Sequence, residues 1–333
     1  MRKLSWRAIQ GALVLLLAGC ASDPAQPRVS KIPEASSAPA PIRSWAPLDS
    51  WVGQYGVEAF GPSRKGTNLV WSVRSKSGTM EIAIGSRNAR WNGRLLWLGY
   101  APTLSENRPQ VHAIDLSRNL RPLLKPEPWK LSRERIVVID PGHGGGNRGT
   151  RSILSGTRFE KEYSLDWARR LKPLLEKRGW KVHLTRDSDV DVPLQDRVAF
   201  ADRRRADLFI SLHFNSSFPK LDPRGIETYA LTPRGLPSTI VRSGKDDVNV
   251  AHAGNAQDAF NLRLATSVHR SLIESLGATD RGVKRARFMT VLQGQKRPAI
   301  LIEAGFLSNP DEARLISSPG YRQKLAEAVA NAL

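Results

Sequence analysis

The sequence predicts an α/β protein: a mostly parallel, twisted sheet flanked by helices, preceded by a small, mostly β domain. Three observations support this prediction. From about residue 134 onward, short apolar runs alternate with segments of helical periodicity, which is the pattern of βαβ units. Two of these runs, 135–140 and 206–213, are almost continuously apolar, as in strands buried on both faces. Residues 45–124 instead contain short alternating runs separated by Gly, Asn and Ser, which are typical of strands and turns.

Residues 1–19 have the features of a bacterial export signal. Positive residues precede a short apolar run from Ile9 to Ala18, which is too brief to span a bilayer comfortably. The run ends at Cys20 in a pattern that resembles the lipoprotein signal, so we expect Cys20 to be lipidated and to become the first residue of the mature chain. A plain signal peptide with an incidental cysteine is the alternative. Cys20 is the only cysteine, so we expect no internal disulfide and no cysteine-based metal site.

Three further segments lead to the predicted catalytic domain. Residues 20–44 are rich in Ala, Ser and Pro without hydrophobic periodicity, and we expect an extended tether. Residues 45–124 form the predicted β domain, and residues 125–133, with two prolines, form a connector to a catalytic domain at 134–333. The β domain contains four tryptophans that could either form a sugar-binding platform or fill a small core: Trp51, Trp71, Trp91 and Trp97.

Within the catalytic domain, the periodicity predicts six strands and five helices. We expect strands at 135–140, 181–185, 206–213, 225–231, 288–292 and 299–303. We expect helices at 160–178, 194–205 and 258–276, one that begins at 309–312, and one at 321–332. The start at Asn309 is well marked, because a capping side chain is followed by proline and two acids.

The charge of the chain narrows its expected partners. Across 333 residues the net charge is +20. In a cytosolic protein such a charge would suggest nucleic-acid binding. Because the amino terminus predicts export, we instead expect contact with anionic envelope polymers and lipid head groups, and no nucleic-acid partner.

Four side chains are predicted to meet at one edge of the sheet. His143 follows the first strand in a Gly-rich turn, His213 ends another strand, and Glu303 ends a third, while Glu160 begins the helix after the first strand. If the strands are parallel, these residues lie along the carboxyl edge, where open α/β sheets bind ligands. Two histidines, one carboxylate and an open position are typical of catalytic zinc, with a further carboxylate as acid/base. Spacing alone does not decide which glutamate is the ligand, and Glu162 is a nearby competitor.

Six segments carry a further signal, at 140–145, 160–165, 184–187, 206–215, 281–284 and 302–309. In this order they resemble the N-acetylmuramoyl-L-alanine amidase family of zinc-dependent cell-wall hydrolases, of the amidase-3 type. The similarity covers about 135–333. One departure lies after His143, where Arg148 occurs with no acid and many relatives carry Lys-Asp. This departure affects the expected substrate contacts near His143 and does not affect the expected metal site.

The resemblance implies a role for each candidate residue. The implied zinc ligands are His143, Glu160 and His213. Glu303 takes the catalytic acid/base role. Asn215 and Arg281 match motif positions that would contact substrate or support the site.

The resemblance also implies a function. We expect an exported, lipid-anchored Zn2+ hydrolase that cleaves peptidoglycan between N-acetylmuramic acid and L-alanine of the stem peptide. The alternatives are a zinc metallopeptidase that cuts within the stem and a non-catalytic wall-binding module. Ala21 after Cys20 resembles the pattern that sorts lipoproteins to the outer membrane, facing the periplasm. Some relatives carry a helix that plugs the zinc site until a partner releases it. The glycines and prolines of 233–257 predict a loop there instead, and an activator protein stays an open question.

Overall fold

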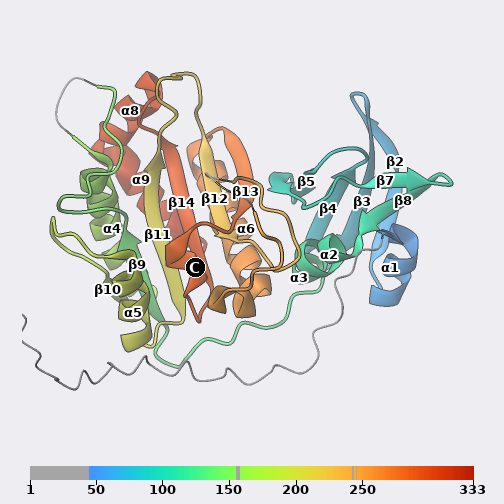
Figure 1. The fold of residues 1–333 in the computed structure, drawn as a ribbon, viewed down its shortest axis with the longest axis horizontal. Coiled ribbons are helices and arrows are strands. Elements are labelled where there is room, and N and C mark those ends of the chain that lie inside the picture. Colours follow the sequence, from blue (N-terminus) through green and yellow to red (C-terminus); the bar gives the residue numbers. More distant parts are fainter. Residues whose placement is uncertain (1–44, 155–157, 242–243, 245) are drawn as a thin grey trace, which may run out of the picture. The chain divides into compact units, whose positions relative to one another are not determined.

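The computed structural model describes residues 45–333 apart from 155–157, 242–243 and 245 (Figure 1). The predicted signal peptide, the lipidation site at Cys20 and the tether lie outside the described residues. Within the described chain no helix is both long enough and apolar enough to cross a bilayer.

The main sheet of the described residues has eleven strands. In spatial order they are β10 (Lys181–Leu184), β9 (Ile136–Pro141), β11 (Leu208–Asn215), β14 (Ala299–Phe306), β12 (Ile226–Leu231), β13 (Asp280–Ala286), β6 (Arg94–Trp97), β5 (Asn88–Trp91), β4 (Gly78–Ala83), β3 (Asn68–Ser75) and β2 (Glu58–Lys65). The first four are mutually parallel, β12 is antiparallel to β14, and β13 is parallel to β12. The predicted mostly parallel sheet of the catalytic region is therefore confirmed.

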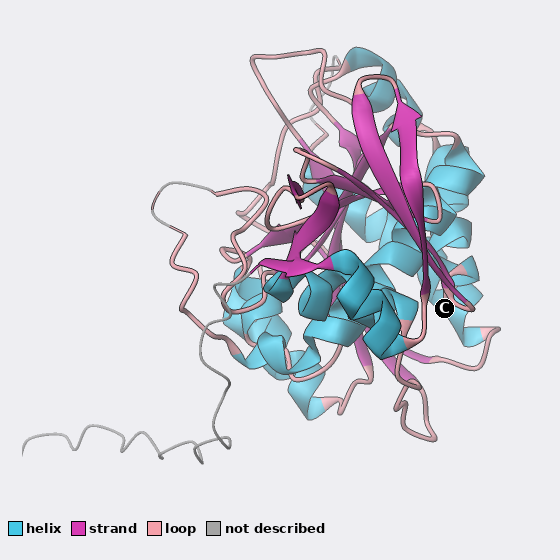
Figure 2. Ribbon diagram, turned by 90° about the vertical axis from the view of Figure 1, so that its right-hand side faces the viewer, coloured by secondary structure: helices cyan, strands magenta, loops and turns pink. Residues whose placement is uncertain are grey.

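Helices cover both faces of the part of this sheet that residues 136–306 form (Figures 1 and 2). One face packs against α4 (Glu160–Glu176), α6 (Asp258–Leu276) and α9 (Pro319–Asn331), and the other against α5 (Leu194–Arg203) and α7 (Thr290–Gln293). Because successive side chains of a strand point to opposite faces, Val137 joins the first core and Val138 the second. The fully apolar run of β9 is explained by this burial on both faces.

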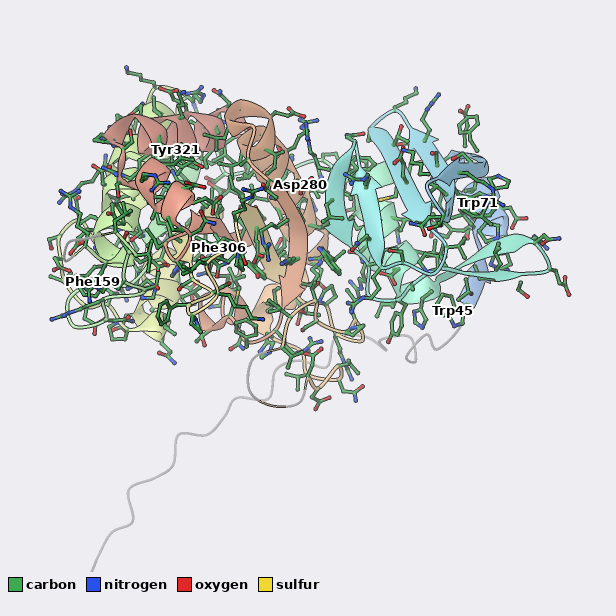
Figure 3. The ribbon with its side chains drawn as sticks, turned by 90° about the horizontal axis from the view of Figure 1, so that it is seen from above. Trp45, Trp71, Phe159, Asp280, Phe306 and Tyr321 are labelled. Atoms are coloured by element: carbon green, nitrogen blue, oxygen red, sulfur yellow. The ribbon has the colours of Figure 1, made fainter. Side chains whose placement is uncertain are left out.

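The amino-terminal region, 45–124, contributes β2 to β6 to the main sheet and also forms a second sheet of three strands. The elements outside the main sheet are β1 (Trp45–Pro47), α1 (Leu48–Tyr55), β7 (Thr103–Ser105), β8 (Arg108–His112), α2 (Ala113–Asp115), η1 (Leu116–Leu120) and α3 (Arg121–Leu124). Trp51 and Trp71 are each 8% exposed and pack in the core, so these two tryptophans fill the interior. Trp71 is labelled in Figure 3. Trp91 and Trp97 are partly buried.

One predicted strand is wrong. Residues 288–292 do not form a strand, because 290–293 form the short helix α7 instead. The strand occurs earlier in the chain, as β13. Its sequence, Asp-Arg-Gly-Val-Lys-Arg-Ala, shows little apolar alternation. Lys284 and Arg285 are nevertheless buried in it, because Glu227 pairs with Lys284 and Asn119 accepts a hydrogen bond from Arg285.

The remaining helices agree with the predicted positions. Helix α8 (Pro310–Ser317) starts where the sequence indicates, and the Asn309 side chain accepts hydrogen bonds from the backbone N–H groups of Asp311 and Glu312. The segment 233–252 contains no helix among its described residues, and the short 3-10 helix η2 (Ala253–Gln257) follows it. The predicted loop 233–257 is thus free of helix in its described residues up to 252 and ends in η2.

Candidate metal centre and active site

Three of the predicted site residues come together at the carboxyl edge of the parallel strands. Nε2 of His143 lies 3.0 Å from Oε2 of Glu160, and Nδ1 of His213 lies 2.8 Å from Oε1 of the same carboxylate. One ligand atom from each residue lies within 4.8 Å of the others. Glu160 is 4% exposed at the first turn of α4, and both histidines are partly buried. The structure thus forms a compact N, N, O donor set.

This donor set fits zinc. Two imidazole nitrogens and one carboxylate are ligands that zinc accepts in catalytic sites with an open position. Nδ1 of His143 lies 2.8 Å from Oδ1 of Asn147, which fixes the ring and leaves Nε2 for an ion. Glu162 does not compete, because its carboxylate accepts a hydrogen bond from the backbone N–H of Phe159 and caps α4.

Two glycines make room for the ligands. A Cβ at Gly142 would lie 2.3 Å from Cε1 of His213. A Cβ at Gly149, where φ is +68°, would lie 2.7 Å from both Oε2 of Glu160 and Cδ2 of His143. No side chain fits at these distances, so the close approach of backbone to ligand requires glycine. His143 itself adopts φ +62°, an uncommon value for a residue with a Cβ.

The carboxylate of Glu160 is held in its charged form. Burial alone would raise its pKa, but hydrogen bonds from His143 and His213 outweigh burial and lower the pKa well below the ordinary value. Burial lowers the pKa of His143, and its contacts with Glu160 outweigh that effect and raise it. Glu160 is therefore negatively charged and ready to bind a cation.

Two buried guanidinium groups hold the turn that carries His143. Arg197 donates to Oδ1 of Asp140 at 2.6 Å and to the carbonyl oxygen of His143 at 2.8 Å. Arg186 donates to the carbonyl oxygens of Pro141 and Gly142 at 3.0 and 2.8 Å. Burial raises the pKa of Asp140, but the charge of Arg197 and hydrogen bonds from neighbouring side chains lower it overall. The backbone around His143 is thus fixed by charge-assisted bonds.

Glu303 lies beside the ligands, on the neighbouring strand. The parallel register of β11 and β14 places Glu303 directly opposite His213. The two residues line one pocket of about 340 Å³, together with His143, Glu160 and Asn215. Glu303 is 9% exposed. The structure therefore places a carboxylate next to the donor set in a partly enclosed space.

The two remaining candidates divide between this pocket and a second one. Asn215 lines both pockets, and its Nδ2 donates to Oε2 of Glu227 at 3.3 Å. Arg281 lines only the second pocket, which has a volume of about 200 Å³ and shares Glu303 as a wall.

Sequence reasoning missed Glu227, which is 2% exposed in the centre of this region. Its carboxylate pairs with Lys284 and Arg281 and accepts a hydrogen bond from the hydroxyl of Tyr229. Burial raises the pKa of Glu227, and the Lys284 ammonium with the other donors lowers it overall. One signal in the sequence could have identified Glu227: it is the single acid in the mostly apolar run of β12. A buried acid needs partners of opposite charge, so this pattern indicates a buried ion pair.

Comparison with known proteins identifies a family for more than half of this chain. The amidase-3 family model, described as N-acetylmuramoyl-L-alanine amidase, matches residues 137–333. N-acetylmuramoyl-L-alanine amidase AmiC of Escherichia coli O6:H1 is 33% identical over 239 residues, which cover 65% of this chain and 56% of AmiC. This chain thus spans little more than half the length of that relative.

Two further proteins are similar over more of their own length. N-acetylmuramoyl-L-alanine amidase AmiA of Escherichia coli K12 is 31% identical over 254 residues, which cover 69% of this chain and 86% of AmiA. The solved structure of an N-acetylmuramoyl-L-alanine amidase from Clostridium difficile 630 has a TM-score of 0.50 at 31% identity, covering 60% of this chain and 95% of that one. Since the family model matches more than half of its residues, the chain belongs to the N-acetylmuramoyl-L-alanine amidase family of the amidase-3 type.

Proposed function

We propose that this protein is a zinc-dependent peptidoglycan hydrolase that cleaves the amide bond between the lactyl group of N-acetylmuramic acid and L-alanine of the stem peptide. The observation that carries the proposal is the placement of His143, Glu160, His213 and Glu303 in one pocket of a chain that belongs to this family. An N, N, O donor set with a carboxylate beside it has the chemistry of amide hydrolysis with an activated water.

His143, Glu160 and His213 would hold the metal, and a bound zinc ion supplies positive charge that polarises the amide carbonyl and acidifies water. Glu303 accepts the proton of the attacking water as the bond between oxygen and the carbonyl carbon forms. Glu303 then gives that proton to the nitrogen as the carbon–nitrogen bond breaks. The products are a lactyl carboxylic acid on the sugar and a free amino group on L-alanine.

The other residues of the centre act by holding these groups in place. Asn147 orients the His143 ring, and Arg197 and Arg186 fix the turn that carries it. Glu303 lies on β14, directly opposite His213 on the adjacent strand β11. This position keeps the Glu303 carboxylate close to the three metal ligands without adding it to them as a fourth ligand. The chain thus separates metal binding from proton transfer.

The proposal includes export and a lipid anchor. Residues 1–19 would direct export, Cys20 would be lipidated, and residues 20–44 would tether the catalytic domain to a membrane, with the outer membrane favoured by Ala21. Metabolic labelling with a fatty acid tests this part. Label on the wild-type protein and none on the Cys20→Ala variant is expected, and equal labelling would contradict the anchor.

The decisive experiment is digestion of purified peptidoglycan with and without a chelator, followed by mass spectrometry of the fragments. We expect stem peptides with a free amino group on L-alanine, no release with the chelator, and restoration by zinc. New amino groups within the stem would instead show a metallopeptidase. Binding to peptidoglycan without release of any fragment would show a wall-binding module.

A further inference from the structure

The second pocket lies on the far side of Glu303 from the metal centre. His213, Glu303 and Glu227 occupy directly opposite positions on the neighbouring strands β11, β14 and β12. Opposite residues project from the same face of a sheet, so the three side chains form a row. In the proposed reaction Glu303 passes a proton to the leaving nitrogen, and this pocket offers the leaving peptide a place beyond Glu303.

Two cations, Lys284 and Arg281, contact one buried acid, Glu227, and Glu303 is the second acid at the wall of this pocket. The Glu227 carboxylate is 3% exposed and pairs with the Lys284 ammonium at 2.7 Å, and the Lys284 side chain is 9% exposed. These two charges therefore neutralise each other below the surface. The side chain of Arg281 is 33% exposed at the wall of the pocket and brings a second positive charge to the same carboxylate.

Two nitrogens of the Arg281 guanidinium group are engaged by the protein. Nε donates to Glu227, and Nη1 reaches the carbonyl oxygen of Arg224 at 3.4 Å. The guanidinium carbon lies 4.9 Å from the ring centre of Phe306, which is 2% exposed and forms a rigid support (Phe306 is labelled in Figure 3). A guanidinium group fixed in this way loses little entropy when it binds a carboxylate, and its planar array of donors matches that group.

The distance between Glu303 and Arg281 suits a substrate carboxylate that lies close to the cleaved bond. Arg281 stands on β13, two strands beyond Glu303, which corresponds to about 10 Å between backbones. Two residues of an extended peptide span about 7 Å, and the arginine side chain covers the rest. The second residue of a stem peptide is an isoglutamate whose α-carboxylate is either free or amidated.

We propose that Arg281 binds the free carboxylate on the second residue of the leaving stem peptide and so selects acidic over amidated stems. This inference rests on the proposed amidase function and adds a specificity determinant to it. Glu227 and Lys284 act as positioning residues, which hold the guanidinium group at the wall of the pocket.

The test uses two muramyl peptides that differ only in isoglutamate or isoglutamine at the second position. We expect the full-length, zinc-loaded wild type to cleave the acidic substrate with a kcat/KM about tenfold higher or more, as a charge-assisted bond implies. Arg281→Gln should lower kcat/KM for the acidic substrate by that factor, mainly through KM, and leave the amidated substrate nearly unchanged. Arg224→Gln is the matched control, because Arg224 is an exposed positive residue in the loop before β12. This variant should keep the preference for the acidic substrate.

Equal cleavage of the two substrates by the wild type would overturn the inference. It would also be overturned if Arg281→Gln weakened both substrates by the same factor, since that result would indicate a structural role through Glu227. If the variant fails to fold, inhibition of the wild type by the two product dipeptides decides the question, with about tenfold tighter binding of the acidic product expected. Failure of the wild type to cleave either substrate would instead contradict the proposed function.

Discussion

Glu227 and Glu303 lie directly opposite each other on the antiparallel strands β12 and β14. One carboxylate borders the metal centre, while the other is enclosed by cations. The two acids thus have separate surroundings although their backbones are adjacent. In the proposed function Glu303 transfers the proton and Glu227 gives structural support, and the two roles can be tested separately.

The first prediction concerns Glu303. Replacing it with Gln should lower kcat by about 10²- to 10⁴-fold, because the amide cannot accept the proton of the attacking water. Zinc content and the melting temperature should stay close to those of the wild type, since Glu303 is not one of the three grouped ligands. Fragment release from peptidoglycan and metal analysis measure the two effects. Near-normal turnover in this variant would remove Glu303 from the mechanism.

The second prediction concerns metal removal. A bound ion stabilises the folded state by about 2.7 kcal/mol when its free concentration is a hundred times Kd. We therefore expect the chelated protein to melt at a lower temperature and added zinc to restore the wild-type value. His213→Ala should lose this zinc response, whereas His183→Ala, outside the centre, should keep it. A zinc response that persists in His213→Ala would place the ion elsewhere.

The third prediction concerns Gly142. An added methyl group would overlap the His213 ring, so Gly142→Ala should weaken zinc binding at least about tenfold and cost about 1–3 kcal/mol of folding free energy. Gly146→Ala is the matched control in the same turn, because no atom lies within 4 Å of the added Cβ. Calorimetric titration with zinc gives both affinities. Equal affinities in the two variants would show that the turn tolerates a side chain at Gly142.

The fourth prediction concerns the buried pair of Arg197 and Asp140, which are 2% and 1% exposed. Arg197→Met leaves the Asp140 charge uncompensated and should cost about 3–5 kcal/mol in urea unfolding. The double variant Arg197→Met with Asp140→Asn should recover part of this loss, because the buried charge is gone as well. A single-variant cost below about 1 kcal/mol would mean that the pair does not support the turn.

The fifth prediction concerns pH. Burial raises the pKa of Asp258 to about 6, so the folded protein keeps a proton that the unfolded chain has already released above the ordinary value. Wild-type stability should therefore fall as pH rises from about 4 to about 6 and stay lower above that. Asp258→Asn lacks this ionisation and should be more stable than the wild type by about 3 kcal/mol at pH 8, with little difference at pH 4. Parallel stability curves for the two proteins would contradict the assignment.

Much of the catalytic region was predictable because its signals are local. Helix α6 has the predicted bounds, and the capping side chain of Asn309 starts α8 where expected. The grouping of His143, His213 and Glu303 follows from parallel strands, whose carboxyl ends share one edge. The assignment of Glu160 rather than Glu162 came from family resemblance, and the structure groups Glu160 with the histidines.

The features that could not be predicted from the sequence depend on contacts between segments that are distant in the chain. β13 looks polar in sequence because the acid that accommodates Lys284 lies on β12, and no local pattern joins the two. The hydrogen bond from Arg197 to the backbone of His143 also joins segments that are distant in sequence, because His143 follows β9 and Arg197 lies on α5. Such pairs become visible only when the strands and helices are packed together.

The pairing of Val283 with Leu96 joins β13 to β6 and so links the proposed substrate strand to the amino-terminal region. The backbone N–H of Leu95 also donates to Asp280 at the start of β13. An unpaired strand edge tends to fray or to recruit a foreign strand. A truncated protein that starts at the connector would therefore be expected to retain its metal ligands while losing discrimination between acidic and amidated stems. Sequence far from the catalytic centre would then set how selectively this protein acts.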